Sequence, residues 1–516
     1  MTPPSSAQNL VEMLERACGV FARRKALIFG SKICAFEELW NESCRAACAI
    51  RQAGARPGER VALLLDNAPE FVFAYFGILM NGSVIVPVNH MFKREEVSHI
   101  LQDSSASILI TSRAYAGLAA EVNTMSENLR KVLLVQDLKD ARIDQEVCRQ
   151  IRERSKNALH SDVAVFLYTS GTTGRPKAAM LTHGNLLSNV RSSAACIHVN
   201  SRDAFACFLP LFHSFAATVC MLMPLHEGAS IVIMKSPRPI RKLIRMIRKH
   251  RVTIFVGIPS LYGIMKDLRL PRWLPGRLLK LLNPLRLAIS GAAALPPEVF
   301  KGFEKKFRLP LLEGYGLTEA SPVVSLNPLG GIRKAGSIGL PIPGVQVKII
   351  DEAGRTLSGQ EEGELCVKGG NVMAGYHGKP EDNSLTLKDG WLLTGDMAKI
   401  DKDGYIFIMG RKKDMVNVRG LNVYPREIED VLYRRPEIRE AAVIGIPDAH
   451  KGEVPKAFVV LKTPGALTEH DIIAYLRQHL ADYKVPRKIE IRNELPKNQA
   501  GKILKRVLAG NVGSIS

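Results

Sequence analysis

Segments with a helical pattern alternate with short runs of β-branched residues over much of this 516-residue chain. The alternation holds from about residue 9 to 228 and resumes from 240 to 290. Strands that alternate with helices are typical of parallel sheets whose faces are covered by helices. We therefore expect helices at 71–81 and 240–250, and strands at 84–88, 108–111, 131–135, 253–256 and 285–290.

The pattern changes after about residue 326, where glycine and proline become frequent. Short runs at 346–350 and 363–368 are typical of antiparallel strands and predict a small β-rich subdomain at about 326–410. From 411 onward, helical and strand patterns alternate over a stretch that is long enough for a separate domain. The expected fold class is α/β and α+β. An N-terminal domain of two helix-covered sheets and the β-subdomain spans 1–410, and a small α+β domain spans 411–516.

The composition is that of a folded globular protein. Hydrophobic residues make up 46% of the chain and charged residues 23%, which excludes disordered, collagen-like and disulfide-scaffold classes. The nine cysteines are odd in number and include no Cys-x-x-Cys pair, so neither a disulfide framework nor a zinc ribbon is expected. A cytoplasmic location fits best, and no run approaches the ~20 apolar residues that a spanning helix needs.

The charge balance is strongly basic, with 71 Lys and Arg against 50 Asp and Glu, a formal charge of +21. Such a charge predicts an anionic partner. Fourteen of the basic residues, but only one acidic residue, lie at 235–286. There, an apolar stripe at 240–247 among cations and a Trp273-containing basic stretch suit the surface of an anionic membrane. For 240–247 the alternative is a solvated basic face on a packed helix. Nucleic acid is not an expected partner, because no recognisable binding motif is present.

The sharpest local feature is the sequence Tyr168-Thr-Ser-Gly-Thr-Thr-Gly-Arg-Pro-Lys177, which follows a strand-like run at 163–167. Its two glycines let backbone N–H groups approach phosphate oxygens, its hydroxyls offer further donors, and Lys177 supplies a positive charge. The spacing is not that of a Walker A loop. A generic surface turn is the alternative interpretation. The candidate phosphate-binding residues are Thr169, Ser170, Gly171, Thr172, Thr173, Gly174 and Lys177.

Three further motifs carry candidate chemistry. In Glu313-Gly-Tyr-Gly-Leu-Thr-Glu319, an aromatic ring could stack on a purine, and Thr318 and Glu319 offer oxygens to a phosphate-bound Mg²⁺. In the second, Trp391-Leu-Leu-Thr-Gly-Asp396 followed by Arg411, the acid could accept ribose hydroxyls; the alternative interpretation, a hairpin turning at 403–404, is compatible with that role. The third, at 496–502, ends in Lys502, which in isolation is typical of a solvated tail charge.

Together, in this order and at these separations, the four motifs resemble the acyl-adenylate-forming superfamily, which includes acyl-CoA synthetases, luciferases and peptide-synthetase adenylation domains. Matching segments at 209–213, 290–296, 336–341 and 422–427 extend the resemblance over nearly the whole chain. The chain is most similar to bacterial long-chain fatty-acid CoA ligases. The resemblance implies an enzyme that uses ATP and Mg²⁺ to form an acyl-AMP and then transfers the acyl group to coenzyme A.

The resemblance also implies roles for individual residues. The loop at 169–177 would cradle the β- and γ-phosphates, Glu319 would bind Mg²⁺, and Thr318 would contact the α-phosphate. Lys502 would bridge the carboxylate and the α-phosphate during adenylation. Adenine would be enclosed by Gly291, Ala292, Glu313, Gly314 and Tyr315, and the ribose would be held by Asp396 and Arg411.

In the family, the C-terminal domain swings between the two half-reactions. The hinge position matches Lys413, and Gly420 and Leu421 would then face the channel for the thiol of coenzyme A. Arg419-Gly420-Leu421 replaces the commoner Ser/Gly-Gly-Glu, which leaves the contacts in that channel open.

The expected acid is apolar. The segment at 208–223, where amino-acid-activating relatives carry an Asp, has no acidic residue. The candidate acyl-pocket residues are His213, Phe215, Gly257 and Ala293, and His213 could gate the carboxylate or be a core histidine. A fatty acid is the favoured substrate. Medium-chain or aryl acids, and a carrier protein in place of coenzyme A, remain alternatives.

Overall fold

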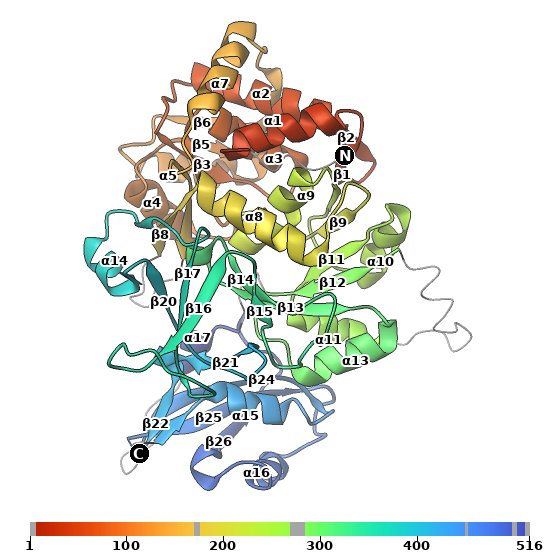
Figure 1. The fold of residues 1–516 in the computed structure, drawn as a ribbon, viewed down its shortest axis with the longest axis vertical. Coiled ribbons are helices and arrows are strands. Elements are labelled where there is room, and N and C mark those ends of the chain that lie inside the picture. The colour runs from red at the N-terminus through yellow and green to blue at the C-terminus, as the bar shows by residue number, and fades with distance from the viewer. Residues whose placement is uncertain are drawn as a thin grey trace.

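The computed structural model describes residues 7–169, 176–268, 284–419, 421–448, 452–497 and 503–510. The N-terminal elements lie at one end of the molecule and the C-terminal elements at the other (Figure 1). This arrangement confirms the expected fold class, a large N-terminal region of helix-covered sheets followed by a smaller α+β unit.

The first sheet has seven strands in the described part of the chain, in the order β18-β8-β7-β4-β3-β5-β6. Its central strands pair in parallel, as the alternating pattern predicts, whereas β7, β8 and β18 pair antiparallel. The bounds are β3 Arg60–Leu64, β4 Val84–Pro87, β5 Ala106–Thr111, β6 Lys131–Leu134, β7 Val163–Thr169, β8 Lys177–Thr182 and β18 Gly375–Tyr376. Helices α3 (Pro69–Met80), α4 (Arg94–Asp103) and α5 (Ala116–Asn123) connect its parallel strands.

The second sheet has nine strands among the described residues, in the order β15-β14-β13-β12-β11-β9-β10-β1-β2. The run from β1 through β10, β9, β11 and β12 to β13 is parallel. The bounds are β1 Lys25–Phe29, β2 Lys32–Ala35, β9 Ala204–Cys207, β10 Ser230–Ile233, β11 Ile254–Gly257, β12 Leu287–Ser290, β13 Leu311–Gly316, β14 Val323–Leu326 and β15 Leu340–Pro341.

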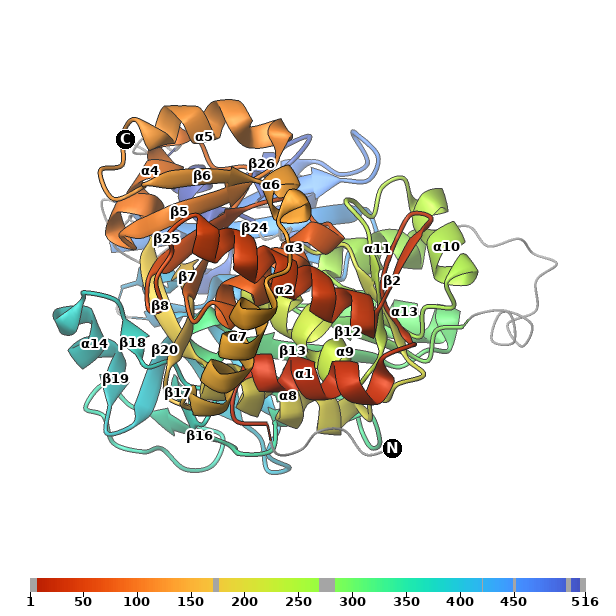
Figure 2. The same ribbon diagram turned by 90° about the horizontal axis from the view of Figure 1, so that it is seen from above.

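Helices α1 (Leu10–Phe21), α2 (Phe36–Gln52) and α8 (His183–Ile197) contribute to a continuous apolar core that joins the two sheets. Both ribbon views show α1 beside α2 and α8 (Figures 1 and 2). Helix α10 (Ile240–Lys249) buries Leu243 and Ile247, while Ile244 is 42% exposed among cations. The apolar stripe is therefore narrower than its spacing predicts, and the basic side chains of α10 are exposed. The stretch around Trp273 lies outside the described residues.

A β-rich subdomain follows, as predicted, drawn in teal in Figure 1. Its antiparallel sheet has the order β16-β17-β20-β19, with β21 beside β20. Asp403 and Gly404 turn the β20–β21 hairpin, and Gly404 has a φ of +83° that glycine tolerates best. The bounds are β16 Val345–Ile350, β17 Gly363–Gly369, β19 Leu387–Lys388, β20 Trp391–Ile400 and β21 Ile406–Arg411.

The C-terminal elements have apolar clusters of their own. Their sheet has the order β23-β22-β25-β24 with β26 beside β25, and helices α15 (Pro425–Leu432) and α16 (Glu469–Arg477) cover it. The strand bounds are β22 Val416–Val418, β23 Leu421–Val423, β24 Ile438–Asp448, β25 Gly452–Leu461 and β26 Lys488–Ile491. No helix in the described ranges is long and apolar enough to cross a membrane.

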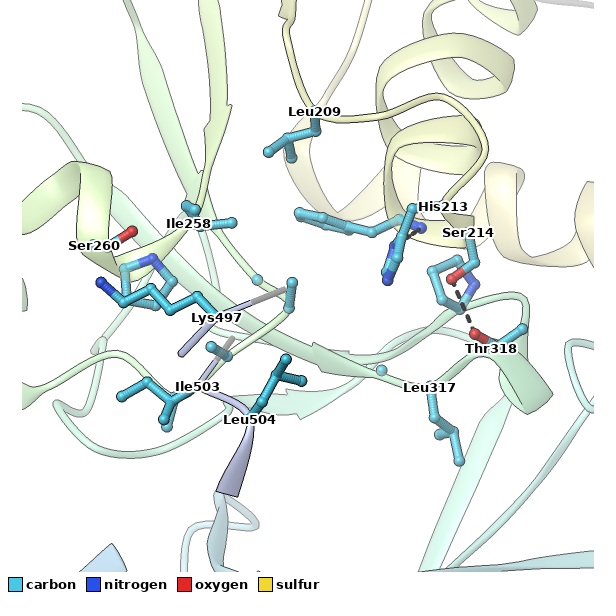
Figure 3. A pocket seen from close by; sticks show the side chains of 18 of the residues that line it. Leu209, His213, Ser214, Ile258, Ser260, Leu317, Thr318, Lys497, Ile503 and Leu504 are labelled. Carbon is cyan, nitrogen blue, oxygen red and sulfur yellow. Dashed lines mark hydrogen bonds between the residues drawn. The ribbon is translucent and has the colours of Figure 1, made fainter. Parts of the chain in front are cut away.

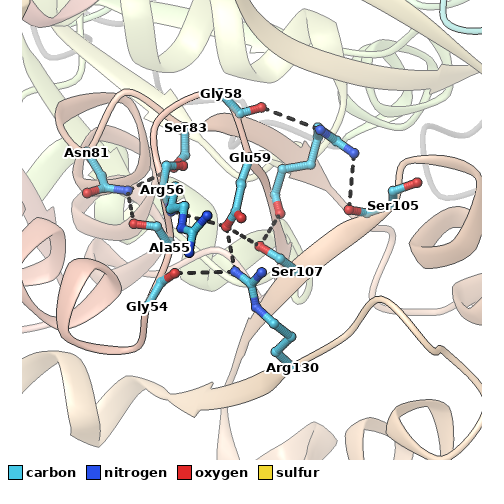
Figure 4. Close-up of polar contacts among 11 residues, drawn as sticks. Gly54, Ala55, Arg56, Gly58, Glu59, Asn81, Ser83, Ser105, Ser107 and Arg130 are labelled. Carbon is cyan, nitrogen blue, oxygen red and sulfur yellow. Dashed lines mark hydrogen bonds and ion pairs between the residues drawn. The ribbon is translucent and has the colours of Figure 1, made fainter.

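A polar network holds the amino ends of the first sheet's parallel strands (Figure 4). The Glu59 carboxylate accepts hydrogen bonds from Ser107 at 3.0 Å and from Arg130 at 2.6 Å. These contacts link the starts of β3, β5 and β6. In open α/β sheets ligands bind at the opposite edge, where the strands have their carboxyl ends.

Candidate active site

A cavity of 3680 Å³ opens where the carboxyl ends of the parallel strands from both large sheets meet the β-subdomain and the C-terminal elements. Thr169 from β7, Gly291 after β12 and Asp396 from β20 line it, as do Arg426 and Lys497 from the C-terminal part. The cavity therefore gathers residues from all the motifs that the sequence singled out and that the structure describes.

Asp396 and Arg411 face one another across the β20–β21 hairpin. Their side chains form an ion pair at 2.7 Å, and the Asp396 side chain is only 5% exposed. The Tyr315 hydroxyl donates to the other oxygen of Asp396 at 2.5 Å. Burial, and then the negative charge of Asp396, raise the pKa of Tyr315, so this hydroxyl stays protonated. The structure thus brings together the two expected ribose contacts and the expected adenine-stacking residue.

Thr318 and Glu319 lie in a short 3₁₀ turn that follows β13. The Thr318 hydroxyl is 3.3 Å from that of Ser214, which comes from a distant loop (Figure 3). Glu319 accepts a hydrogen bond from the Tyr376 hydroxyl at 2.7 Å. Burial and the charge of Glu319 raise the pKa of Tyr376, which keeps it a donor.

The residues around Glu319 fit a magnesium ion that is shared with a ligand. Tyr376 occupies one carboxylate oxygen, and the other oxygen and the Thr318 hydroxyl are the hard ligands that Mg²⁺ prefers. No group of three His, Cys, Asp or Glu side chains suited to a metal occurs in the part of the chain that the structure describes. Such a site suits Mg²⁺ that is held by one carboxylate together with phosphate oxygens and water.

Glycine is required on sterics just before this turn. A Cβ on Gly316 would lie 2.1 Å from the carbonyl oxygen of Pro322, and one on Gly314 would lie 2.9 Å from Leu326. Both contacts are with the antiparallel neighbour β14 or the turn that precedes it. The glycines therefore let the chain return closely on itself and fix the place of Thr318 and Glu319.

Glu313 lies in β13, where it pairs with Ser290, the last residue of β12, and its side chain is buried. Its carboxylate accepts from the backbone N–H of Leu295 at 2.9 Å and so anchors the loop that carries Gly291 and Ala292. Burial raises the pKa of Glu313 to about 7, although the charge of Arg426 opposes this shift. Glu313 holds the loop that was expected at adenine.

The phosphate-loop motif lies between two paired strands. Thr169 ends β7 and pairs with Lys177, the first residue of β8. Ser170, Gly171, Thr172, Thr173 and Gly174 lie outside the described residues. The Lys177 ammonium forms an ion pair with Asp382, a residue of helix α14 (Pro380–Thr386).

The acyl-pocket candidates separate into two groups. His213, Phe215 and Ala293 line the cavity, and the Phe215 N–H donates to Nδ1 of His213 at 3.3 Å. A Cβ on Gly291 would lie 2.7 Å from the Phe215 ring. Gly257 is instead buried beneath Tyr262, whose ring a Cβ there would meet at 3.2 Å, and it is not among the residues that line the cavity.

The C-terminal segment reaches the same cavity. Lys497, Ile503 and Leu504 line it (Figure 3), and Lys497 forms a β-bridge with Ile503. Lys502 and Gly420 lie outside the described residues. Lys413 lines the cavity, whereas Leu421 is 49% exposed and does not.

Sequence reasoning missed three residues that complete the site, namely Ser214, Tyr376 and Asp382. Each contacts a motif residue that is 57 to 205 positions away along the chain. None belongs to a local pattern of its own. Only the pairing of β18 with β8 brings Tyr376 and α14 to the cavity, and that pairing has no signature in a single sequence.

Comparison with known proteins agrees with this geometry. Residues 14–377 match the AMP-binding enzyme family and residues 427–502 match the AMP-binding enzyme C-terminal domain. A long-chain-fatty-acid–CoA ligase of Bacillus subtilis is 35% identical over 98% of this chain and 95% of its own length. A feruloyl-CoA synthase of Amycolatopsis is 35% identical over 93% of this chain and 94% of its own. The crystal structure of an anthranilate CoA ligase with anthranoyl-AMP, 27% identical, superposes with a TM-score of 0.85 over 98% of this chain and 97% of that one.

Proposed function

Because this chain belongs to the AMP-binding enzyme family, we propose that it is the ligase that joins a long-chain fatty acid to coenzyme A. Its general reaction is the ATP- and Mg²⁺-dependent conversion of a carboxylic acid to an acyl-AMP, followed by transfer of the acyl group to coenzyme A with release of AMP. The proposal concerns the identity of the acid and the roles of individual residues.

The observation that carries the proposal is that one cavity is lined both by the charged residues described above and by a row of apolar side chains. Phe215, Val219 and Met223 line it at intervals of four residues along one helical segment. Such an apolar wall suits a hydrocarbon chain. No acidic residue occurs in 208–223, so nothing there would pair with the ammonium group of an amino acid.

In the first half-reaction, the carboxylate of the acid attacks the α-phosphorus of ATP and pyrophosphate leaves. Asp396 and Arg411 hold the ribose, Tyr315 stacks on the adenine, and Thr318 donates to the α-phosphate. Glu319 would hold Mg²⁺, which would supply positive charge to the phosphates when bound. The chain itself contributes positioning and preorganised charge, which are the main sources of rate in phosphoryl and adenylyl transfer.

In the second half-reaction, the thiol attacks the acyl carbon of the adenylate and AMP leaves. We assign the carboxylate bridge of the first step to Lys502, because its described neighbours Lys497 and Ile503 line the cavity. Lys413, which follows the β20–β21 hairpin, serves as the hinge about which the domain 411–516 turns. Gly420 and Leu421 then reach the thiol channel.

A chain-length panel tests the proposal. Pyrophosphate release with ATP and Mg²⁺ is measured with saturated acids from four to eighteen carbons. Formation of the acyl thioester is then measured with coenzyme A and, separately, with a holo acyl-carrier protein as the acceptor. The proposal expects kcat/KM to be highest for acids of twelve carbons or more, and turnover with coenzyme A. Highest activity with short acids, or turnover with the carrier protein alone, would refute it.

Aryl acids are the second candidate. The feruloyl-CoA synthase and the anthranilate CoA ligase among the relatives act on aromatic acids by their names, and Phe215 packs against Gly291 where a ring could lie. The same panel therefore includes ferulate and anthranilate. A kcat/KM for either acid above that of every fatty acid assigns the enzyme to this class.

We also propose that α10 contacts anionic membrane surfaces. Arg241, Lys242 and Arg245 are exposed on it beside Ile244. Such a face gains roughly 1 kcal/mol per cation near an anionic bilayer. Replacing the three cations with Glu is expected to reduce co-sedimentation with phosphatidylglycerol vesicles. Unchanged co-sedimentation contradicts the contact.

A further inference from the structure

A chain of polar contacts runs from the phosphate-loop lysine to the proposed magnesium ligand. The Lys177 ammonium pairs with Asp382 and lies 5.8 Å from the centre of the Tyr376 ring. The Tyr376 hydroxyl in turn donates to Glu319 at 2.7 Å. All four side chains line the cavity. Asp382 of α14 is thus at one end of a network that includes Lys177 and Glu319, the residues proposed to serve the phosphates and Mg²⁺.

Asp382 is not needed to hold α14 in place, because its neighbour Asn383 does so. The Asn383 side chain accepts from the N–H of Tyr376 at 2.6 Å and donates to the carbonyl of the same residue at 3.0 Å. The Asp382 side chain is 29% exposed at the cavity wall, whereas that of Lys177 is 12% exposed. The Asp382 carboxylate is therefore a negative charge on the side of α14 that lines the cavity.

This placement conflicts with the role of Lys177. Under the proposed function, on which this inference rests, the ammonium of Lys177 serves the triphosphate of ATP. In the structure a carboxylate already occupies it. A phosphate oxygen and the Asp382 carboxylate are both anionic acceptors, and charge-assisted contacts of either kind are among the strong ones. A phosphate oxygen therefore competes with the Asp382 carboxylate for the same ammonium.

We propose that Asp382 is a positioning residue that competes with the phosphates of ATP and pyrophosphate for Lys177. The contact with Asp382 keeps Lys177 oriented while the site is empty, and it weakens the hold of the site on the phosphates. After adenylation, the return of Lys177 to Asp382 promotes the release of pyrophosphate, which otherwise drives the first step backward.

Charge bookkeeping at the cavity supports competition. Glu319, Asp382 and Asp396 are acidic, and Lys177 and Arg411 are basic, so these five side chains leave one net negative charge. Asp382 is the member of this set that pairs with Lys177, so its removal frees the Lys177 ammonium for the phosphates. One unit charge at this range, partly screened by solvent, is expected to change phosphate affinity by roughly 3- to 10-fold.

The test uses Asp382→Asn in the full chain, with binding of Mg·ATP and of pyrophosphate measured by calorimetry in the absence of any acid. Both dissociation constants are expected to fall by roughly 3- to 10-fold, and the gain should shrink in 0.5 M salt. In a Lys177→Met background the same substitution should give no gain, since the shared partner is gone.

Glu381→Gln is the matched control, because it removes the same charge from an exposed position of the same helix. It is expected to leave both constants unchanged. Weaker or unchanged binding in Asp382→Asn, an equal gain in the control, or a gain that persists without Lys177 would overturn the inference. Because binding is measured without an acid substrate, these results do not depend on the chain-length panel. A negative result in that panel would refute the proposed acid and would leave the inference about Asp382 standing.

Discussion

The buried carboxyl of Glu313 makes the stability of this protein depend on pH in a direction opposite to that of most acidic residues. Its side chain is 2% exposed and has one backbone donor, the N–H of Leu295. Burial raises its pKa from the ordinary 4.5 to about 7. The folded state therefore binds this proton more tightly than the unfolded state does. The stability that it contributes is complete below pH 4.5 and is lost as the pH rises through 7.

The substitution Glu313→Gln isolates this effect, because glutamine keeps the shape and the acceptor oxygen but does not titrate. Linkage between pKa values of 4.5 and about 7 gives a loss in the wild type of about 2.5 kcal/mol between pH 5 and pH 8. The variant avoids that loss, so its stability relative to the wild type should rise by about the same amount.

Urea unfolding of both proteins at pH 5, 6, 7 and 8, followed by fluorescence, measures this difference, and the comparison cancels the titration of all other groups. Glu121→Gln, an exposed site on α5, serves as the control and should follow the wild type at every pH. A difference between Glu313→Gln and the wild type that stays constant from pH 5 to pH 8 would refute the reasoning.

Three further predictions concern the cavity. Gly291→Ala places a methyl on the loop expected at adenine, 2.7 Å from the Phe215 ring, so the KM for the acid should rise roughly 10-fold and ATP binding should weaken as well; an unchanged KM for the acid in steady-state assays contradicts this packing. Tyr376→Phe removes the hydrogen-bond donor to Glu319 and should slow acyl-AMP formation by ~10-fold, while thioester formation from supplied acyl-AMP keeps its rate. An equal loss of rate in both half-reactions would count against this role of Tyr376. Asp396→Asn leaves its arginine partner uncompensated and should weaken ATP binding by at least ~10-fold, measured by calorimetry; wild-type affinity would exclude a ribose role.

Much of this architecture was predictable because local patterns carry it. The helix at 71–81 and the strand at 84–88 appear as α3 and β4, and the change to antiparallel strands after 326 appears as β16 and β17. Periodicity and turn residues act over a few positions, so a single sequence records them. The motifs were also predictable as a set, because their order and separation carry the resemblance to a known superfamily.

Contacts between distant segments were not predictable in the same way. Tyr376 meets Glu319, and Asp382 meets Lys177, only because a two-strand pairing of β18 with β8 closes the cavity wall. Gly257 was expected in the acyl pocket because it is small, but its backbone lies beneath Tyr262. Small size allows a residue to line a cavity, and the packing of a neighbouring ring decides whether it does.

The central claim, activation of a fatty acid as its adenylate, is tested most directly by trapping that intermediate. The enzyme is mixed with ATP labelled at the α-phosphate, Mg²⁺ and hexadecanoate without coenzyme A, and the quenched products are separated. The account predicts labelled hexadecanoyl-AMP in an amount close to that of the enzyme, which is converted to AMP and hexadecanoyl-CoA when coenzyme A is added. Labelled ADP as the product, or no labelled adduct that depends on the acid, would contradict it.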